Sequence, residues 1–399
     1  MSSLFPVAEP TRRVGVVLGT RPEAVKLAPL VVALRASAHY EPVVVSTGQH
    51  RDLLAPLLGF FGVQPDLDLD LMRAGQSLAD LAGLATTRIG QAIEDLGLDL
   101  LVVQGDTTTT LAGALAGFYH RVPVVHVEAG LRTDDRLSPY PEEVNRRAVT
   151  QLADLHLAPT DRAAERLLAE GVDPSRVLVT GNTVIDALFE TVRRRHPYAG
   201  PDAAALADAE GAGRLLLVTA HRRESWGVGL DGIAEAVGRL VDAHPDLTVV
   251  FPVHPNPLVR EPVRRRLGGS DRVLLAEPLD YPSFVRLLAR ADLVLTDSGG
   301  IQEEACSLGR PTLVARDTTE RPEGIEAGGL RLVGTDPARI VAEATRLLTD
   351  PAAYGALVCR SLPFGDGTAS ARAVAALDLL FPVPLPGPLV DLDSHATPA

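Results

Sequence analysis

The stretch over residues 101–147 constrains the fold more than any other part of the chain, because it reads as strand, turn, helix and strand. Apolar runs at 101–103 and 122–127 have the pattern of buried strands, and the apolar residues between them recur at helical spacing. This order predicts parallel strands of an open α/β sheet, in which ligands bind outside the carboxyl ends of the strands. Asp106 and Glu128 follow the two strands, so we expect both carboxylates to face one cavity.

These acids suggest acid/base chemistry, with Glu142 on the following loop as a third carboxylate. Two of them also have a structural interpretation. Asp106 fits equally well as the cap of a helix that begins at residue 107, and Glu142 fits as an acid beside the positive end of a helix. Glu128 ends an apolar strand and has no capping role, which favours a function.

The strand–helix pattern starts again after a stretch at 197–213 that is rich in Pro, Ala and Gly, which we interpret as a linker. The loops after the strands correspond in order between the halves: GTR matches AHR, GQH matches VHP, and GD matches DS. A chain of 399 residues is also long for one core. We therefore predict an α/β fold with two Rossmann-like domains that face each other across a cleft. Helical patterns at 336–349 and 367–381 precede a Pro-rich tail at 382–399 that we expect to be mobile.

Bulk composition disfavours several classes of function. A net charge of −13 argues against binding to nucleic acid or to an anionic membrane surface. No apolar run approaches the roughly 18 residues of a membrane span, and the N-terminus lacks a signal-peptide pattern, so we expect a soluble, cytoplasmic protein. Cys306 and Cys359 are the only cysteines, which favours neither a disulfide framework nor a cysteine zinc site.

We predict no cofactor. His50, His221 and His254 stand on separate loops without an HExxH pattern, which disfavours a metal site. No Walker A or GxGxxG pattern follows a strand, which disfavours ATP and NAD chemistry.

The sequence DSGGIQEE at 297–304 gives the clearest ligand signal. Gly299 and Gly300 at the start of a helix cost about 1 kcal/mol each relative to alanine. A ligand close to the bare backbone would explain this cost, because N–H groups at a helix N-terminus bind phosphate. The alternative is a tight strand–helix turn capped by its Asp or Ser. Glu304, one turn further, has the position to accept a hydrogen bond from a sugar hydroxyl, or simply lies near the helix start.

Cationic side chains gather at three strand ends of this acidic chain. They are Arg21 with Lys26, the loop at 221–223, and the loop at 316–321 that ends in Arg321. A single arginine is more often a solvated surface residue. Their coincidence on three loops suggests a diphosphate ligand.

Nine ordered motifs resemble those of the non-hydrolysing bacterial UDP-N-acetylglucosamine 2-epimerases: GTRPEAVKLAPL, QGDTTTTLAGALA, HVEAGLRT, SPYPEEVNR, TGNTVIDAL, TAHRRESWG, PVHPNP, LTDSGGIQEEA and RDTTERPE. The similarity covers about residues 14–381. It implies the glycosyltransferase-B architecture, with a final helix that crosses back to the first domain. The expected domains are then 1–190 together with the helix at 367–381, and 191–366. The resemblance also implies a homodimer that acts without metal or nicotinamide.

The reaction that the resemblance implies is the reversible conversion of UDP-GlcNAc into UDP-ManNAc, by loss of UDP to 2-acetamidoglucal and re-addition. A hydrolysing 2-epimerase, a glycosyltransferase of the same architecture and a UDP-sugar sensor stay open as alternatives.

Position by position, the resemblance also assigns roles to single residues. The catalytic set is Asp106, Glu128, Glu142 and His221. The substrate-binding set is Arg21, Lys26, Phe284, Ser298, Gly299, Gly300, Glu304 and Arg321. A second, activating UDP-GlcNAc would contact Gln49, His50 and Gln76, but Gly75 stands where activated relatives often carry an arginine.

Overall fold

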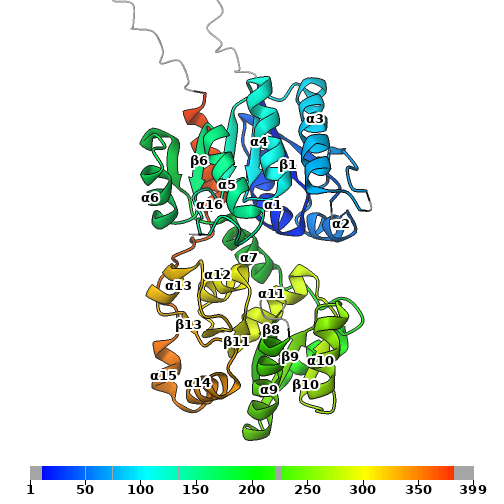
Figure 1. Cartoon of the computed structure of the whole chain (residues 1–399), viewed down its shortest axis with the longest axis vertical. Helices are drawn as coiled ribbons and strands as arrows, with labels where there is room; N and C mark the ends of the chain where they lie inside the picture. The colour runs from blue at the N-terminus through cyan, green and yellow to red at the C-terminus, as the bar shows by residue number, and fades with distance from the viewer. Residues whose placement is uncertain (1–10, 50, 74, 134, 221–226, 382–399) are drawn as a thin grey trace, which may run out of the picture.

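The computed structural model describes residues 11–381 except 50, 74, 134 and 221–226, and it contains two parallel β-sheets. Each sheet is covered by helices, and the two resulting lobes lie end to end (Figure 1). The predicted α/β class with two parallel sheets is therefore confirmed. Within the described residues, no helix is both long enough and apolar enough to cross a bilayer.

The first lobe is built on a seven-stranded sheet with the order β3-β2-β1-β4-β5-β6-β7. Its strands are β1 (Arg12–Leu18), β2 (Tyr40–Ser46), β3 (Leu67–Asp68), β4 (Leu100–Gln104), β5 (Val124–Val127), β6 (Leu155–Ala158) and β7 (Val177–Val179). Its helices are α1 (Arg21–Arg35), α2 (Arg51–Phe60), α3 (Leu78–Leu96), α4 (Thr108–His120), α5 (Glu142–Leu152), α6 (Asp161–Ala169) and the 3-10 turn η1 (Pro174–Arg176). Strands β4 and β5 are buried along their whole length, as continuous apolar strands with helices on both faces should be.

The second lobe is built on a six-stranded sheet with the order β10-β9-β8-β11-β12-β13. Its strands are β8 (Arg214–Thr219), β9 (Leu247–Pro252), β10 (Val273–Ala276), β11 (Leu293–Thr296), β12 (Thr312–Val314) and β13 (Leu330–Leu332). Its helices are α8 (Ala203–Gly211), α9 (Val228–Ala243), α10 (Pro257–Leu267), α11 (Tyr281–Arg290), α12 (Gly299–Ser307), α13 (Pro322–Glu326), α14 (Pro337–Thr349) and α15 (Pro351–Ala356).

One prediction about the chain between the lobes was wrong. The stretch 197–213 was expected to be a linker, but it contains α8, whose Leu206 and Ala209 are buried in the apolar cluster beneath the second sheet. The run of alanines that gave no strand pattern is a good helix former. The connection between lobes is therefore shorter than predicted.

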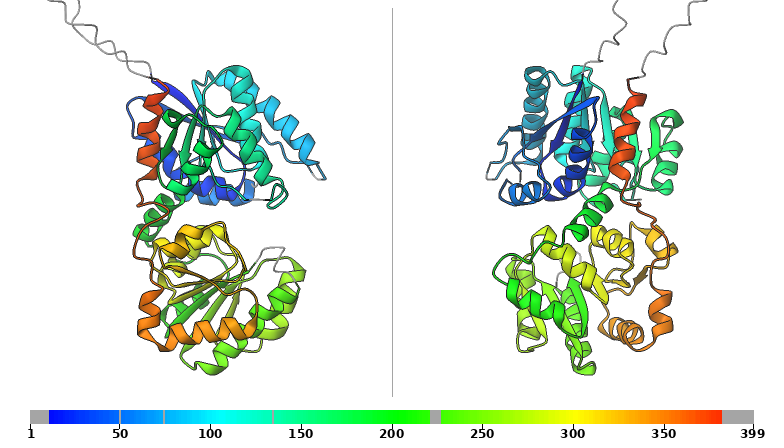
Figure 2. Two further views of the ribbon diagram at one scale, coloured as in Figure 1. Left: turned by 60° about the vertical axis from the view of Figure 1, so that its left-hand side comes forward. Right: turned by 180° about the vertical axis from the view of Figure 1, so that it is seen from behind.

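Two helices join the lobes. Helix α7 (Thr183–Arg194) packs against α1 of the first lobe and against α11 and α12 of the second (Figure 1). Helix α16 (Ala369–Ala376), followed by η3 (Leu377–Leu379), returns to pack on α1 and α7 (Figure 2). The Tyr40 hydroxyl donates to Asp378 at 2.6 Å, which fastens this segment to β2. On this packing we propose that the final helices belong with the first lobe, as the expected domain division has it.

Candidate active site

Asp106 and Glu128 lie at neighbouring strand ends. Strand β4 pairs with β5 so that Gln104 stands opposite Val127; Glu128 follows Val127 directly, and Asp106 follows Gln104 after Gly105. Glu128 is buried and has a φ of 61°, in the left-handed region that a side chain with a Cβ rarely adopts. Such a conformation costs on the order of 1–3 kcal/mol and persists only where the surroundings enforce it.

Strong hydrogen bonds hold the Glu128 carboxylate in place. Lys26 Nζ lies 2.5 Å and 2.6 Å from its two oxygens. Gln104 Nε2 donates to it at 2.5 Å, and Asn182 Nδ2 donates at 2.8 Å. Burial acts to raise the pKa of Glu128, but Lys26 and Arg321 outweigh it, so the pKa is lowered and the carboxylate stays ionised.

The cationic partner shows the matching effect. Burial acts to lower the pKa of Lys26, but the charges of Glu128 and Glu303 outweigh it and the pKa is raised. Lys26 and Glu128 therefore form a buried pair of full charges, which is stable only while both members are present.

A second ion pair comes from the other lobe. Arg321, at the start of α13, donates to Glu303 of α12, and both side chains are almost fully buried. Burial raises the pKa of Glu303, while Arg321 opposes the shift. Asn182 Nδ2 also donates to Glu303 at 2.7 Å, so that one amide contacts both acids. We call these six residues the Glu128 cluster: Lys26, Gln104, Glu128, Asn182, Glu303 and Arg321.

Asp106 does not cap α4. The N-cap is Thr107, whose hydroxyl accepts from the Thr110 N–H, so the capping alternative was wrong. The Asp106 carboxylate instead lies 2.5 Å from an Arg146 guanidinium nitrogen and is about a quarter exposed. Asn145 Nδ2 donates to the Asp106 main-chain carbonyl at 2.9 Å. The Asp106 carboxylate is therefore part of an ion pair and not a helix cap.

Glu142 is the first residue of α5, where a carboxylate is stabilised by the helix dipole. Its Oε2 is buried and has no hydrogen-bond partner among the described residues. A buried acceptor without a partner costs roughly 1–3 kcal/mol. A hydroxyl group of a ligand that donates to this oxygen would relieve the cost.

Sequence reasoning missed Glu23, which braces the loops after β1 and β4. Its carboxylate accepts from the N–H groups of Gly19 and Thr20 at 2.9 Å and 2.6 Å. Its other oxygen accepts from the Thr107 hydroxyl at 2.6 Å. The sequence did hold a local signal, because Thr followed three residues later by Glu is the pattern of a capping box.

The N-terminus of α12 is left open. Ser298 is the N-cap residue, and its side chain makes no capping hydrogen bond. Gly300 is exposed, and a Cβ there would meet no atom within 4 Å. The first backbone N–H groups of a helix have no partner within the helix. Gly300 is therefore an exposed donor suited to an anion, whereas Gly299 beside it is buried.

Glu304 lies one turn beyond and is buried. Burial raises its pKa to about 7, against the hydrogen bond that it accepts from the Tyr281 hydroxyl at 2.9 Å. Arg21, an exposed residue at the start of α1, acts on Glu304 across the lobe boundary by lowering its pKa. Phe284 is half-buried on α11 and packs against the core beside α8. The contacts of Arg21, Glu304 and Phe284 with a nucleotide stay predictions.

Two predicted residues, His50 and His221, lie outside the described residues. Gln49 accepts weakly from the Thr109 hydroxyl at 3.4 Å, and Gln76 accepts from the Arg73 N–H at 3.3 Å. The two glutamines contact different partners, and the activating site stays a prediction. Within the part of the chain that the structure describes, no group of three His, Cys, Asp or Glu residues is arranged to hold a metal.

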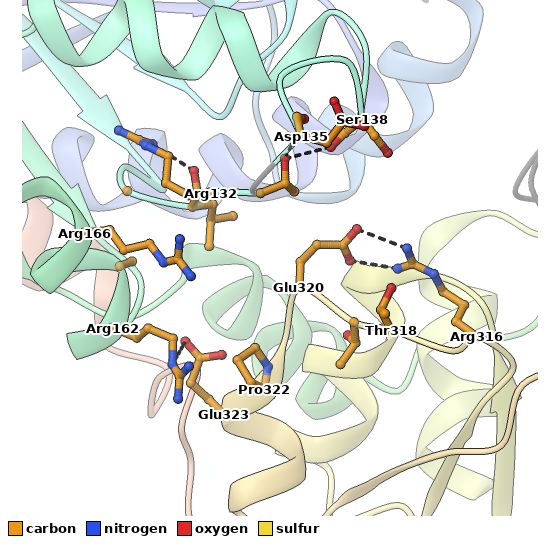
Figure 3. Close-up of a pocket in the computed structure, with 15 residues that line it drawn as sticks. Arg132, Asp135, Ser138, Arg162, Arg166, Arg316, Thr318, Glu320, Pro322 and Glu323 are labelled. Atoms are coloured by element: carbon orange, nitrogen blue, oxygen red, sulfur yellow. Dashed lines mark hydrogen bonds and ion pairs between the residues drawn. The ribbon is translucent and has the colours of Figure 1, made fainter. Parts of the chain in front are cut away.

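A cavity of about 390 Å³ is lined by residues of both lobes (Figure 3). It is lined by residues of the loop after Glu128, by helix α6, and by the loop before and after Arg321: Gly130, Leu131, Arg132, Thr133, Asp135, Ser138, Arg162, Ala163, Arg166, Arg316, Thr318, Thr319, Glu320, Pro322 and Glu323. None of the predicted catalytic acids lines it. The cavity shows that the loops flanking the cluster enclose space between the two lobes.

Known proteins share this arrangement. A sequence model of the family described as UDP-N-acetylglucosamine 2-epimerase matches residues 32–378. The enzyme of that name from Yersinia pestis is 50% identical over 90% of this chain and 97% of its own length. The one from Bacillus subtilis is 48% identical over 92% of this chain and 94% of its own.

Solved structures agree with the sequence relatives. The UDP-GlcNAc 2-epimerase of Neisseria meningitidis bound to UDP-GlcNAc is 40% identical, covers 92% of this chain and 99% of its own, and superposes with a TM-score of 0.84. The Methanocaldococcus jannaschii enzyme in complex with UDP-GlcNAc and UDP is 30% identical with a TM-score of 0.77, over 92% of this chain and 99% of its own. The chain therefore belongs to the UDP-N-acetylglucosamine 2-epimerase family.

Proposed function

We propose that this protein interconverts UDP-GlcNAc and UDP-ManNAc by eliminating UDP across C1 and C2 of the sugar and adding it back. The observation that carries the proposal is the Glu128 cluster, in which a buried carboxylate is kept ionised beside a cation of each lobe. The relatives named above carry the same activity in their names.

The chemistry explains why such a site is needed. The proton on C2 is not adjacent to a carbonyl, so its direct removal would be very slow. Elimination to 2-acetamidoglucal needs a base at C2 and stabilisation of the departing diphosphate. Re-addition needs a proton donor on the opposite face of the sugar.

The first lobe supplies the acid/base groups in this proposal. Glu128, ionised by Lys26, can accept a proton but has none to donate. The donor must then be another group, and Asp106 or Glu142 provides it, with the unpartnered Oε2 of Glu142 free to contact the sugar. His221 is proposed near the diphosphate, where a positive charge would favour its departure.

The second lobe holds the nucleotide in this proposal. The open N-terminus of α12, with Ser298, Gly299 and Gly300, is suited to the diphosphate. Arg321 and Arg21 add positive charge. Glu304 accepts a ribose hydroxyl, and Phe284 lies on the uracil side.

Isotope incorporation tests the proposal. With UDP-GlcNAc as the substrate in D2O, proton NMR should show deuterium at C2 of both UDP-GlcNAc and UDP-ManNAc, with only traces of free UDP. Absence of label from both sugars while epimerisation proceeds would contradict the elimination route. Stoichiometric release of UDP would instead identify a hydrolysing epimerase, and turnover only with an added acceptor would identify a glycosyltransferase.

We further propose that the working form is a homodimer in the cytoplasm. Sedimentation equilibrium should give twice the mass of 42.2 kDa. A monomer that retains full activity would remove the dimer from the proposal and leave the reaction untouched.

A further inference from the structure

Asn182 makes one contact with an acid of each lobe. Its Nδ2 lies 2.8 Å from Glu128 Oε1, at the end of β5, and 2.7 Å from Glu303 Oε2, on α12. Asn182 itself is the residue before α7, the helix that joins the lobes, and it is 2% exposed. A contact of this kind exists only while the two lobes keep this relative position.

The orientation of the amide is fixed at both ends. Its oxygen accepts from the Val184 N–H at 3.1 Å, as the N-cap of α7. Its nitrogen carries two protons and has two carboxylate acceptors, so each proton has one partner. No flip of the amide would satisfy these three contacts, because an oxygen cannot donate to a carboxylate.

The amide also connects two ion pairs. Glu128 is paired with Lys26 of α1, and Glu303 is paired with Arg321 of the loop before α13. Arg321 is the residue that the proposed function places on the nucleotide. A change in the Arg321–Glu303 ion pair therefore alters the hydrogen bonds of Asn182, and through them the position of the Glu128 carboxylate, the proposed base.

We propose that Asn182 is a positioning residue that makes the orientation of the Glu128 carboxylate depend on the Glu303–Arg321 pair, and so on the nucleotide bound to Arg321. This inference rests on the proposed function. It assigns Glu303 a part as well, because without its carboxylate the second proton of the amide has no acceptor.

A purely structural role is the alternative, since Asn182 caps α7. Serine and aspartate are both good N-cap residues, so Asn182→Ser and Asn182→Asp keep the cap. Serine, however, offers one proton for two carboxylates, and ionised aspartate offers none. Asp336→Ser is the matched control, because Asp336 caps α14 through the Ala338 N–H and lies outside the Glu128 cluster.

The test is steady-state kinetics with UDP-GlcNAc, together with UDP affinity by calorimetry and thermal unfolding of each variant. Asn182→Ser should lower kcat by up to about 100-fold, the loss expected when a catalytic group is misplaced, with KM and UDP affinity changed far less. Asp336→Ser should leave kcat at the wild-type value. If Asn182→Ser keeps its kcat and loses only thermal stability, Asn182 is a helix cap and the inference fails.

The pH profile tests whether position 182 is coupled to the Glu128 carboxylate. Glu128 faces Lys26 from α1 and Glu303 and Arg321 from the second lobe. A third carboxylate in Asn182→Asp raises the pKa of this set by repulsion. The acidic limb of kcat should therefore move to higher pH in Asn182→Asp and stay in place in Asp336→Ser. An unmoved limb would contradict the inference.

Glu303→Gln keeps the test decisive even if an Asn182 variant folds poorly. In this variant one amide oxygen replaces two carboxylate oxygens, so Asn182 and Arg321 compete for a single acceptor. Glu303→Gln should therefore lower kcat too. The double variant with Asn182→Ser should lose less than the product of the two single losses, because both changes weaken the same bridge. Independent, multiplicative losses would overturn the coupling. Failure of the wild-type protein to epimerise would instead overturn the proposed function.

Discussion

The Glu128 cluster and the N-terminus of α12 differ in how many of their polar groups have hydrogen-bond partners within the protein. In the cluster, two carboxylates, two cations and two amides hydrogen-bond one another and are shielded from water. At the start of α12 the cap residue makes no capping bond and an exposed glycine leaves open space. The groups proposed to transfer the proton are thus held by contacts within the protein, whereas the proposed diphosphate site has a cap residue without a capping hydrogen bond and an exposed Gly300.

The largest effect should come from neutralising the carboxylate itself. Glu128→Gln keeps the shape but removes the base, and turnover should fall by about 10²–10⁴-fold. UDP affinity, measured by calorimetry, should stay close to the wild-type value because the proposed UDP-binding residues lie on the second lobe. Glu165→Gln, at an exposed acid on α6, is the control. A parallel loss of UDP binding would show that the two regions are not separable.

Removing the positive charge of Lys26 should destabilise the protein. Lys26→Met leaves a buried, uncompensated carboxylate, which typically costs about 3–5 kcal/mol. Denaturant unfolding should show this loss, and the double variant Lys26→Met with Glu128→Gln should regain part of it. A full loss in the double variant would mean that packing of the lysine stem, and not charge pairing, stabilises the site.

A smaller effect is the pH dependence of the unfolding free energy that Glu304 of α12 should cause. Glu304 has its pKa raised to about 7 in the fold from 4.5, so the folded state binds its proton more tightly than the unfolded chain does. The stabilisation that Glu304 contributes is complete below its pKa in the unfolded chain, and it is lost as the pH rises through its pKa in the folded protein. Relative to Glu304→Gln, the wild type should lose up to about 3 kcal/mol of unfolding free energy between pH 4.5 and 7. Parallel pH curves for the two proteins would refute this.

The smallest effect should separate folding from binding most cleanly. Gly300→Ala meets no atom and replaces a glycine in a helix, so it should stabilise the fold by up to about 1 kcal/mol. The added methyl group should hinder a diphosphate at the helix end and weaken UDP binding about tenfold, or roughly 1.4 kcal/mol. Unchanged UDP affinity would exclude the N-terminus of α12 as the diphosphate-binding site.

Local pattern sufficed to predict the two strand ends of the site. Apolar runs are buried on both faces of a parallel sheet, and the carboxyl ends of adjacent strands must lie together. Asp106 and Glu128 could therefore be placed side by side before the structure was known. The start of α12 at the two glycines was also predicted from the sequence, while their contact with a ligand stays a prediction.

Contacts between distant parts of the chain could not be predicted in this way. Asn182 and Glu303 are 121 positions apart, and they meet only because α7 carries one lobe onto the other. Likewise the sulfurs of Cys306 and Cys359 lie 2.6 Å apart, although their sequence spacing indicated no link, and both are free thiols. Such pairs depend on how the lobes and the final helices pack, which no short motif encodes.

A crystal structure of the protein with UDP tests most directly whether the second lobe binds the nucleotide while the first lobe supplies the acid/base groups. The diphosphate should lie on the backbone N–H groups of Gly299 and Gly300, with Arg321 beside it and the Glu128 carboxylate facing the space where the sugar would follow. UDP bound away from the start of α12, or a Glu128 carboxylate turned away from that space, would contradict the account.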